Sequence, residues 1–223
     1  MLIVDDGSRD NTADIIRDYM TRHPSVRLLQ NPGNKGKGYS VRHGMLEGKG
    51  DILILSDADL SAPIYEAKKL FAAIEHDATR GGGAQIAIGS RWKDPRTQTQ
   101  RQPIYRQITG RIFNFLLRSI LGLRVKDSQC GFKAFTRTAA HAIFPHQKIE
   151  RWGFDAELLF LGMKLGYKSA EIPVEWKNDL RSKINPIRDG FSIVWDMVRI
   201  RWYSISGRYS HVSEKAVASS AKT

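Results

Sequence analysis

The sequence predicts an α/β fold with a mixed, mostly parallel central sheet flanked by helices. Short apolar runs alternate with segments of helical period through the first half of the chain, which is typical of such folds. Residues 52–55 are apolar without alternation, as expected for a strand that is covered on both faces. The length of 223 residues fits one domain at roughly 100–200 residues each.

The first half of the chain is a regular succession of strands and helices. Residues 11–21 place apolar side chains on one helical face, and residue 10 or 11 is a suitable N-cap. A glycine-rich loop occupies residues 31–38. The elements expected here, in order, are strand 1–4, helix 11–21, strand 26–30, helix 39–47, strand 51–56, helix 63–76 and strand 85–89.

The second half contains longer helices. We expect helix 104–123, strand 131–135, helix 154–165, strand 170–176 and helix 191–205, followed by a polar tail at 206–223. The helix at 191–205 is apolar around most of its circumference. We therefore expect one domain over 1–205, with halves at 1–91 and 92–205, and a frayed C-terminus.

The charge of the chain indicates an anionic partner. Lysine and arginine outnumber aspartate and glutamate by 35 to 23, which gives a net charge of +12. Nucleic acid, a phosphorylated ligand or an anionic membrane surface would fit this charge. The single cysteine, Cys130, excludes an intrachain disulfide and fits a reducing compartment. The sequence shows neither an apolar run of the ~18 residues that span a bilayer nor a basic and apolar leader, so we expect a cytoplasmic protein.

Acidic turns follow two of the expected strands, where ligands of parallel sheets bind. Asp57-Ala58-Asp59 leaves the strand at 51–56, and its hard oxygen ligands suit Mg²⁺ or Mn²⁺ bridged to a substrate phosphate. The turn after the first strand consists of Asp5, Asp6, Gly7 and Ser8. We expect the two turns to converge. Helix capping by the aspartates, or a simple Asp-Gly turn, explains the same residues without a ligand.

Two basic segments could bind anions. The loop that opens the helix at 39–47 contains Lys35, Gly36, Lys37 and Gly38. Its amides and ammonium groups fit a phosphate, but its spacing matches neither the Walker motif nor the dinucleotide motif, so a solvated turn fits as well. A second cationic cluster consists of Arg91, Arg101, Arg106, Lys177 and Lys183; such residues often form only a solvated face.

The helices at 104–123 and 191–205 combine aromatic and aliphatic residues with arginines. Helices of this composition lie in the interfacial plane of anionic membranes. The alternative is that they pack on the sheet and on each other. The six histidines show no metal-binding spacing, and Cys130 fits a buried structural residue better than a catalytic thiol.

Taken in order, these motifs resemble one family. The segments Val4–Ser8, 34–38, 57–59 and 89–91 resemble the nucleotide-sugar half of an inverting family-2 glycosyltransferase of the GT-A fold. The later sequences Asp-Ser-Gln-Cys-Gly-Phe-Lys at 127–133 and Glu-Arg-Trp-Gly-Phe-Asp-Ala-Glu at 150–157, with Ser-Lys at 182–183, resemble the branch that transfers glucose to dolichyl phosphate. Dolichyl-phosphate mannose synthases are a sister branch.

This resemblance implies a metal-dependent transfer of a hexose, with glucose from UDP-glucose expected, to a polyprenyl or dolichyl phosphate with inversion. Mg²⁺ or Mn²⁺ would bind Asp57 and Asp59. The donor would contact Asp5, Asp6, Gly7, Ser8, Lys35, Gly36, Lys37, Gly38, Asp57, Ala58 and Asp59. The acceptor would contact Arg91, Arg106, Gln129, Lys133, Trp152, Lys177, Ser182 and Lys183. The catalytic set would be Asp57, Asp59, Asp155, Arg91 and Arg106.

The resemblance also assigns roles and a location. Asp155 matches the position where related enzymes with hydroxyl acceptors place a base, so it is a candidate base or sugar-orienting group. The acceptor phosphate, with a second pKa near ~6, is already a nucleophile, so a strong base is less necessary. The partners would be the nucleotide sugar, the lipid phosphate and an anionic membrane surface, without nucleic acid. The protein would bind peripherally at the cytoplasmic face.

One departure from the family leaves alternatives open. Family members begin with a further strand and helix that carry a Pro-x-Tyr-Asn-Glu motif, whereas this sequence begins at the equivalent of the second strand. We therefore expect an unpaired sheet edge and an incomplete base pocket, and an inactive or truncated paralogue is one alternative. A GDP-mannose donor is another. From other classes, residues 57–61 faintly resemble the nucleophile loop of haloacid-dehalogenase-type phosphatases, and a basic nucleic-acid-binding protein would explain the charge without a recognisable module.

Overall fold

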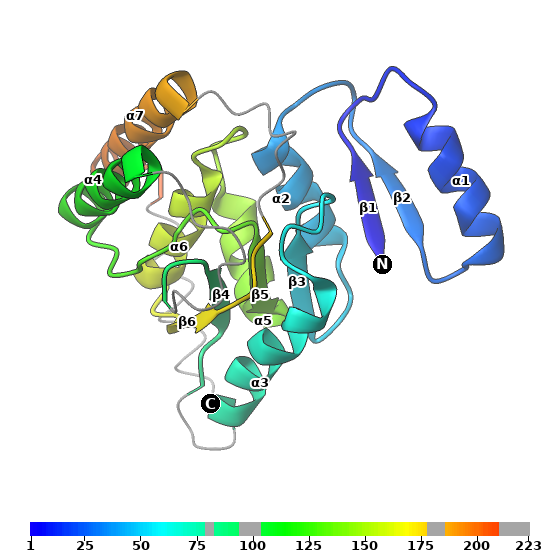
Figure 1. Cartoon of the computed structure of the whole chain (residues 1–223), viewed down its shortest axis with the longest axis horizontal. Coiled ribbons are helices and arrows are strands. Elements are labelled where there is room, and N and C mark those ends of the chain that lie inside the picture. Colours follow the sequence, from blue (N-terminus) through cyan, green and yellow to red (C-terminus); the bar gives the residue numbers. More distant parts are fainter. Residues whose placement is uncertain (79–82, 94–103, 178–185, 210–223) are drawn as a thin grey trace.

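The fold is a layered α/β arrangement, as predicted (Figure 1). The computed structural model describes residues 1–78, 83–93, 104–177 and 186–209. The strands are β1 (Leu2–Asp5), β2 (Arg27–Gln30), β3 (Ile52–Ser56), β4 (Ile86–Ser90), β5 (Phe132–Thr136) and β6 (Ser169–Pro173). The α-helices are α1 (Thr12–Arg22), α2 (Lys37–Glu47), α3 (Ala67–Ala78), α4 (Ile104–Leu121), α5 (Arg137–Ile143), α6 (Phe154–Lys164) and α7 (Pro186–Ile205).

The strands form two sheets among the described residues. Strands β1 and β2 pair in parallel, and a second sheet has the order β3-β5-β4-β6. In the second sheet β4 and β6 are parallel, but β5 runs antiparallel to both of its neighbours. The sheet is mixed, as expected, with more antiparallel pairing than the sequence indicated. An apolar run specifies that a strand is buried and leaves its direction open.

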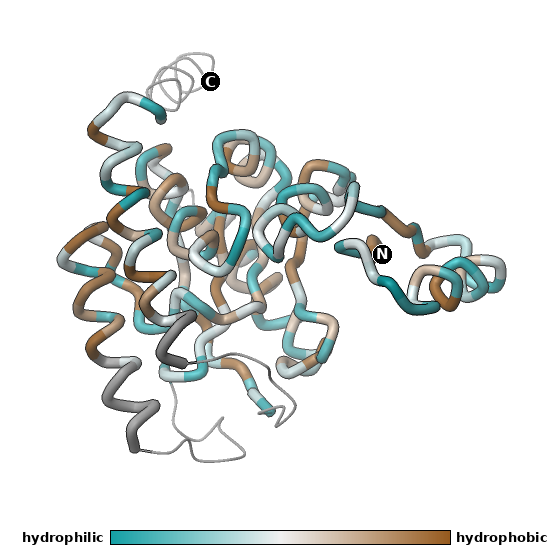
Figure 2. The backbone as a smooth tube through the Cα atoms, turned by 90° about the horizontal axis from the view of Figure 1, so that it is seen from above, coloured by the Kyte–Doolittle hydropathy of each residue, from teal (hydrophilic) through white to brown (hydrophobic). Residues whose placement is uncertain are grey.

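The β1–α1–β2 segment stands apart from the larger sheet (Figure 1), and Figure 2 shows the same separation from a second direction. Within the described part of the chain β1 pairs only with β2, and β3 pairs only with β5. Helix α2 contacts both β1 and β3, and α1 has no buried residue. Among the described residues, β1 and β3 therefore each have one edge without a strand partner.

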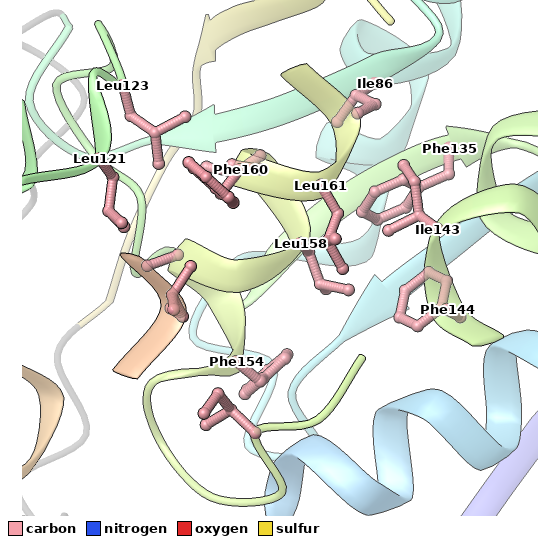
Figure 3. Close-up of a cluster of buried hydrophobic side chains, with 14 of the residues drawn as sticks. Ile86, Leu121, Leu123, Phe135, Ile143, Phe144, Phe154, Leu158, Phe160 and Leu161 are labelled. Carbon is pink, nitrogen blue, oxygen red and sulfur yellow. The ribbon is translucent and has the colours of Figure 1, made fainter. Parts of the chain in front are cut away.

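The core lies on both faces of the larger sheet. Figure 3 shows the cluster around α6, whose residues from Phe154 to Gly162 are all buried. Strand β5 alternates between the faces: Phe135 belongs to the α6 cluster, whereas Phe132 and Ala134 pack with α3 on the other face. This alternation turns Lys133 toward the α6 face. The strand therefore delivers one charged side chain into the layer that also holds the buried Asp155 of α6.

Three local differences from the sequence prediction have simple causes. Helix α5 (Arg137–Ile143) was not predicted; it is short, and Thr136 caps it by accepting a hydrogen bond from the Ala139 amide. Helix α2 begins two residues earlier than expected, at Lys37. The predicted helix at 63–76 is a 3₁₀ turn at Ile64–Glu66 followed by α3.

Candidate active site

Asp57 and Asp59 lie in a turn at the carboxyl end of β3, as predicted. The Leu60 amide donates to the Asp57 carbonyl oxygen (3.1 Å), which closes the turn. Asp59 Oδ1 accepts from the Ser61 amide (2.9 Å), so this exposed carboxylate is held by its own turn. The Lys177 amide donates to the Ser61 carbonyl oxygen (2.8 Å), which places Lys177 beside the same turn.

The Asp57 carboxylate lies in a recess formed by Gly131. A Cβ atom added to Gly131 would lie 2.1 Å from Asp57 Oδ2 and 2.5 Å from its Cγ. Such distances are far below van der Waals contact, so only glycine leaves room for the carboxylate. Gly131 directly precedes β5, which pairs with β3 so that Ser56 is opposite Phe132. Strand pairing therefore brings these two distant parts of the sequence together.

Lys37 connects Asp57 to an aromatic side chain. Its Nζ lies 2.7 Å from Asp57 Oδ1 and 5.4 Å from the centre of the Trp152 ring. Lys37 is the first residue of α2, where the helix dipole disfavours a cation. The ion pair with Asp57 offsets this cost. Lys37 was predicted to contact the donor and Trp152 the acceptor, and the structure places the two side by side.

Asp6 fixes the loop that precedes α2. Its carboxylate accepts hydrogen bonds from the amides of Lys35 (2.9 Å) and Gly36 (2.8 Å) and from Asn31 Nδ2 (2.8 Å). Burial favours the neutral form, but these hydrogen bonds outweigh it and lower the pKa of Asp6. The two loop amides that the sequence suggested for an anion thus already bind a carboxylate.

Asp5 has a structural role in the preceding turn. Ser8 donates to Asp5 Oδ1 from both its amide (3.1 Å) and its hydroxyl (2.5 Å). These bonds, chiefly the hydroxyl bond, lower the pKa of Asp5. Gly7 has a φ of +78°. The simple turn considered for this motif is therefore formed, and it holds Asp6 next to the α2 loop.

A cavity of about 380 Å³ lies at the N-terminus of α2. It is lined by Asp6, Asn34, Gly36, Lys37, Ser40, Arg151 and Trp152. The pocket therefore joins the predicted donor motifs to the 150–157 segment. Arg151 was missed by the sequence analysis, although it precedes Trp152 within a segment that was singled out. Two cations and an exposed aromatic ring suit a nucleotide with its phosphates.

Gly36 lets the two sides of this pocket meet. It has a φ of +103°, and an added Cβ would lie 2.6 Å from the Glu150 carbonyl oxygen. The same oxygen accepts from the Tyr39 amide (3.1 Å). Glu157, which is buried, accepts from the amides of Lys148 (2.9 Å) and Ile149 (2.8 Å). The segment before Arg151 is thus held both by α2 and by α6.

Asp155 and Lys133 form a buried ion pair close to the site. Lys133 Nζ also donates to the Cys130 carbonyl oxygen (2.5 Å). Burial raises the pKa of Asp155, while the ammonium groups of Lys133 and Lys37 oppose the rise. Lys133 was predicted to contact the acceptor. In the structure it has no exposed surface, and it holds Asp155 instead.

Arg91, a predicted phosphate clamp, binds Asp127 in a bidentate manner. Its Nε and one terminal nitrogen donate to the two carboxylate oxygens (2.7 and 2.8 Å), and its amide donates as well (2.9 Å). Burial opposes ionisation of Asp127, but Arg91 lowers the pKa of that carboxyl. The guanidinium also lies 5.0 Å from the centre of the Trp176 ring. Arg91 therefore anchors the segment around Asp127.

Of the remaining predicted acceptor residues, the structure describes the side chain of only one, Gln129. Gln129 lies two residues after Asp127, and its buried Nε2 has no hydrogen-bond partner among the residues that the structure describes; an unpaired buried donor suits a ligand oxygen. Arg106 belongs to α4, but its side chain is outside the described set. Ser182 and Lys183 also lie outside the described residues.

We expect Cys130 to resist alkylation in the folded protein. The side chain is completely buried, and this burial raises the pKa of the thiol to about 12. The reactive thiolate is therefore nearly absent at pH 8. Iodoacetamide at pH 8, followed by intact-mass measurement, should leave the native protein unmodified and add one label in denaturant. Rapid labelling of the native protein would show that the thiol is accessible.

Comparisons with known proteins identify the family of the chain. The family model for glycosyl transferase family 2 matches residues 1–144. Dolichyl-phosphate beta-glucosyltransferases of Trichomonas vaginalis, Dictyostelium discoideum and Homo sapiens are 37%, 34% and 30% identical over 97%, 93% and 94% of the chain. The chain spans 63%, 64% and 65% of the lengths of these relatives.

The fold has solved counterparts. Glucosyl-3-phosphoglycerate synthase from Mycobacterium tuberculosis, in complex with Mn²⁺ and uridine-diphosphate-glucose, aligns with a TM-score of 0.57 at 16% identity and covers 88% of this chain and 67% of that chain. A second structure of that enzyme, which also contains glycerol 3-phosphate, aligns with a TM-score of 0.54 at 16% identity and covers 91% and 67%. These likenesses confirm the predicted GT-A fold. By the family model, which matches more than half of its length, the chain belongs to glycosyl transferase family 2.

Proposed function

We propose that this chain carries the catalytic domain of a glucosyltransferase that transfers glucose from UDP-glucose to dolichyl phosphate or a similar polyprenyl phosphate, with inversion. The observation that carries the proposal is the Asp57 carboxylate, held in the Gly131 recess and joined through Lys37 to the pocket at the N-terminus of α2. The names of the relatives support glucose and dolichyl phosphate as the transferred group and the acceptor.

The residues of the turn fit a divalent cation. Asp57 and Asp59 offer hard carboxylate oxygens, and the recess at Gly131 fixes one of them. No group of three or more His, Cys, Asp or Glu side chains that could hold a metal occurs in the described ranges. Mg²⁺ is commonly bound by one or two carboxylates with the remaining ligands from substrate phosphates and water. A metal at this site would therefore depend on the donor diphosphate for further ligands.

Sugar transfer to a phosphate acceptor depends more on neutralising the charge of the leaving diphosphate than on a general base. When bound, the cation would neutralise charge that develops on the leaving diphosphate. Lys37 and Arg151 line the pocket and would add positive charge next to the same group. Asp155 is buried and paired with Lys133, which suits orientation of the sugar or of the acceptor. The acceptor phosphate is largely dianionic at neutral pH and can attack without a strong base.

A donor panel tests this proposal. The full-length protein is assayed with a polyprenyl phosphate acceptor and radiolabelled UDP-glucose, UDP-galactose or GDP-mannose, each with and without Mg²⁺. We expect label in the lipid fraction from UDP-glucose, lost on chelation, with a product of inverted configuration. Transfer only from GDP-mannose would replace the donor assignment. Release of free phosphate without transfer would favour a phosphatase.

We also propose that α4 and α7 bind an anionic membrane surface, where a lipid acceptor resides. The two helices pack together along one side of the molecule (Figure 1). A stripe of exposed apolar residues runs along α7: Phe191, Trp195, Val198, Trp202 and Ile205. Helix α4 adds Ile112 and Phe115. No described helix is both long and apolar enough to span a bilayer, so binding would be interfacial.

Serine at positions 191 and 195 is expected to weaken vesicle binding. Burial of one aromatic side chain contributes ~1.5–3 kcal/mol, so Phe191→Ser with Trp195→Ser should lower the affinity for vesicles containing phosphatidylserine at least tenfold. Co-sedimentation measures this. Ile64→Ser, an exposed apolar residue far along the chain from both helices, is the matched control and should bind normally. Equal binding of all three proteins, or no preference for anionic over neutral vesicles at low salt, would rule out the proposed membrane role of the two helices.

A further inference from the structure

The ion pair between Lys37 and Asp57 occupies the place that a divalent cation would need. Lys37 Nζ lies 2.7 Å from Asp57 Oδ1, and the two side chains retain 27% and 25% of their accessible surface. The pair is therefore reachable from solvent. A lysine ammonium on its four-carbon stem can change partners at modest cost, in contrast to a fully buried ion pair.

The two oxygens of Asp57 are not equivalent. Oδ2 lies deeper in the Gly131 recess, since an added Cβ would be 2.1 Å from Oδ2 and 2.7 Å from Oδ1. Oδ1 is the oxygen that Lys37 contacts. A cation that binds Oδ1 therefore competes with the Lys37 ammonium for the same oxygen.

Lys37 could also form an ion pair with a ligand in the neighbouring pocket. It lines the pocket at the N-terminus of α2 together with Arg151 and Trp152, and its ammonium already lies over the Trp152 ring. A diphosphate in this pocket would offer Lys37 anionic oxygens in exchange for Asp57. The displaced ammonium would then pair with the ligand, and the carboxylate would pair with the metal.

We propose that Lys37 is an exchangeable counter-ion, which occupies Asp57 until a divalent cation and a nucleoside diphosphate arrive together. The inference rests on the proposed function and adds a binding order to it. Metal alone binds weakly because it must displace Lys37 without compensation. Metal and diphosphate bind cooperatively because the diphosphate accepts the released ammonium, and this coupling is reciprocal.

The test measures metal and nucleotide affinity separately. Free Mn²⁺ is followed by electron paramagnetic resonance in the wild type, Lys37→Gln and Arg151→Gln, with and without UDP. Lys37→Gln should bind Mn²⁺ alone about fivefold more tightly, the equivalent of the ~1 kcal/mol of a partly exposed ion pair. It should bind UDP less tightly and lose the cooperativity. Arg151→Gln removes an equal charge from the same pocket without releasing Asp57 and should leave Mn²⁺ affinity within about twofold of wild type.

A second readout follows Lys37 directly. Titration with Mg²⁺ and UDP should change the emission of Trp152 in the wild type, because the ammonium leaves its position over the ring, and Trp152→Phe identifies that signal. Lys37→Gln should show a smaller change, because no ammonium leaves the ring when UDP enters the pocket. Equal Mn²⁺ affinity of wild type and Lys37→Gln overturns the exchange and leaves the proposed function intact. Absence of Mn²⁺ binding by every variant, even with UDP, removes the proposed metal dependence and the exchange with it.

Discussion

Asp57→Asn is expected to lower the rate of sugar transfer at least ~100-fold, the scale of losing one charge-stabilising group in an active site. Asparagine keeps the shape that fits the Gly131 recess but loses the anionic ligand and the ion pair with Lys37. The pair is partly exposed and contributes little to folding, so the thermal midpoint should hardly move. Transfer is measured with radiolabelled donor, and stability by thermal denaturation.

Two further variants control this result. Asp59→Asn should lower the rate of transfer to a similar extent, because Asp59 is the second carboxylate of the same turn. Asp14→Asn removes an exposed carboxylate from α1 and should leave the rate unchanged. Turnover close to that of the wild type in both Asp57→Asn and Asp59→Asn, with the metal requirement retained, would contradict the assignment of these residues.

Gly131→Ala is expected to disable the site by geometry alone. The new methyl group would overlap the Asp57 carboxylate, 2.1 Å from Oδ2 and 2.5 Å from Cγ. Either the carboxylate rotates away or the end of β5 shifts, and both outcomes displace Asp57 from Lys37. We expect a loss of transfer of ~100-fold, comparable to misplacing a reacting group by 1 Å. Overpacking should also destabilise the fold by ~1–3 kcal/mol.

Gly190→Ala is the matched control for this substitution. Gly190 lies in α7, and an added Cβ would have no neighbour within 4 Å. Alanine is the better helix former by about 0.5–1 kcal/mol, so this variant should be as active as the wild type and slightly more stable. If Gly131→Ala retained both activity and stability, the recess would not position Asp57. Urea denaturation and the transfer assay distinguish these outcomes.

Local sequence pattern was sufficient for most of the fold. The strands and helices of the first half follow from apolar periodicity and from turn residues, because each element is short and bounded by Gly, Pro, Asn or Asp. The antiparallel direction of β5 could not be predicted in this way, since it depends on which strands it meets in space. Helix α5 (Arg137–Ile143) was not predicted because it has only about two turns, too few for a clear apolar period, and its start depends on the cap that Thr136 supplies.

The candidate site was predictable in its residue types and less so in its contacts. The turn of Asp57 and Asp59 follows from its place after a buried strand. The role of Lys133 does not, because the sequence shows a lysine in a motif but not that strand alternation buries it beside Asp155. Arg151 enters the pocket because the segment before α6 packs against Gly36. Such pairings between distant segments arise only in the folded chain.

The most direct test of the account is a crystal structure of the protein grown with Mn²⁺ and UDP-glucose or UDP, with anomalous diffraction to locate the metal. We predict one Mn²⁺ at the Asp57 and Asp59 turn, the diphosphate between this ion and the pocket of Lys37, Arg151 and Trp152, and Lys37 released from Asp57. A nucleotide bound elsewhere, or an Asp57 carboxylate still paired with Lys37 beside an occupied pocket, would contradict the account.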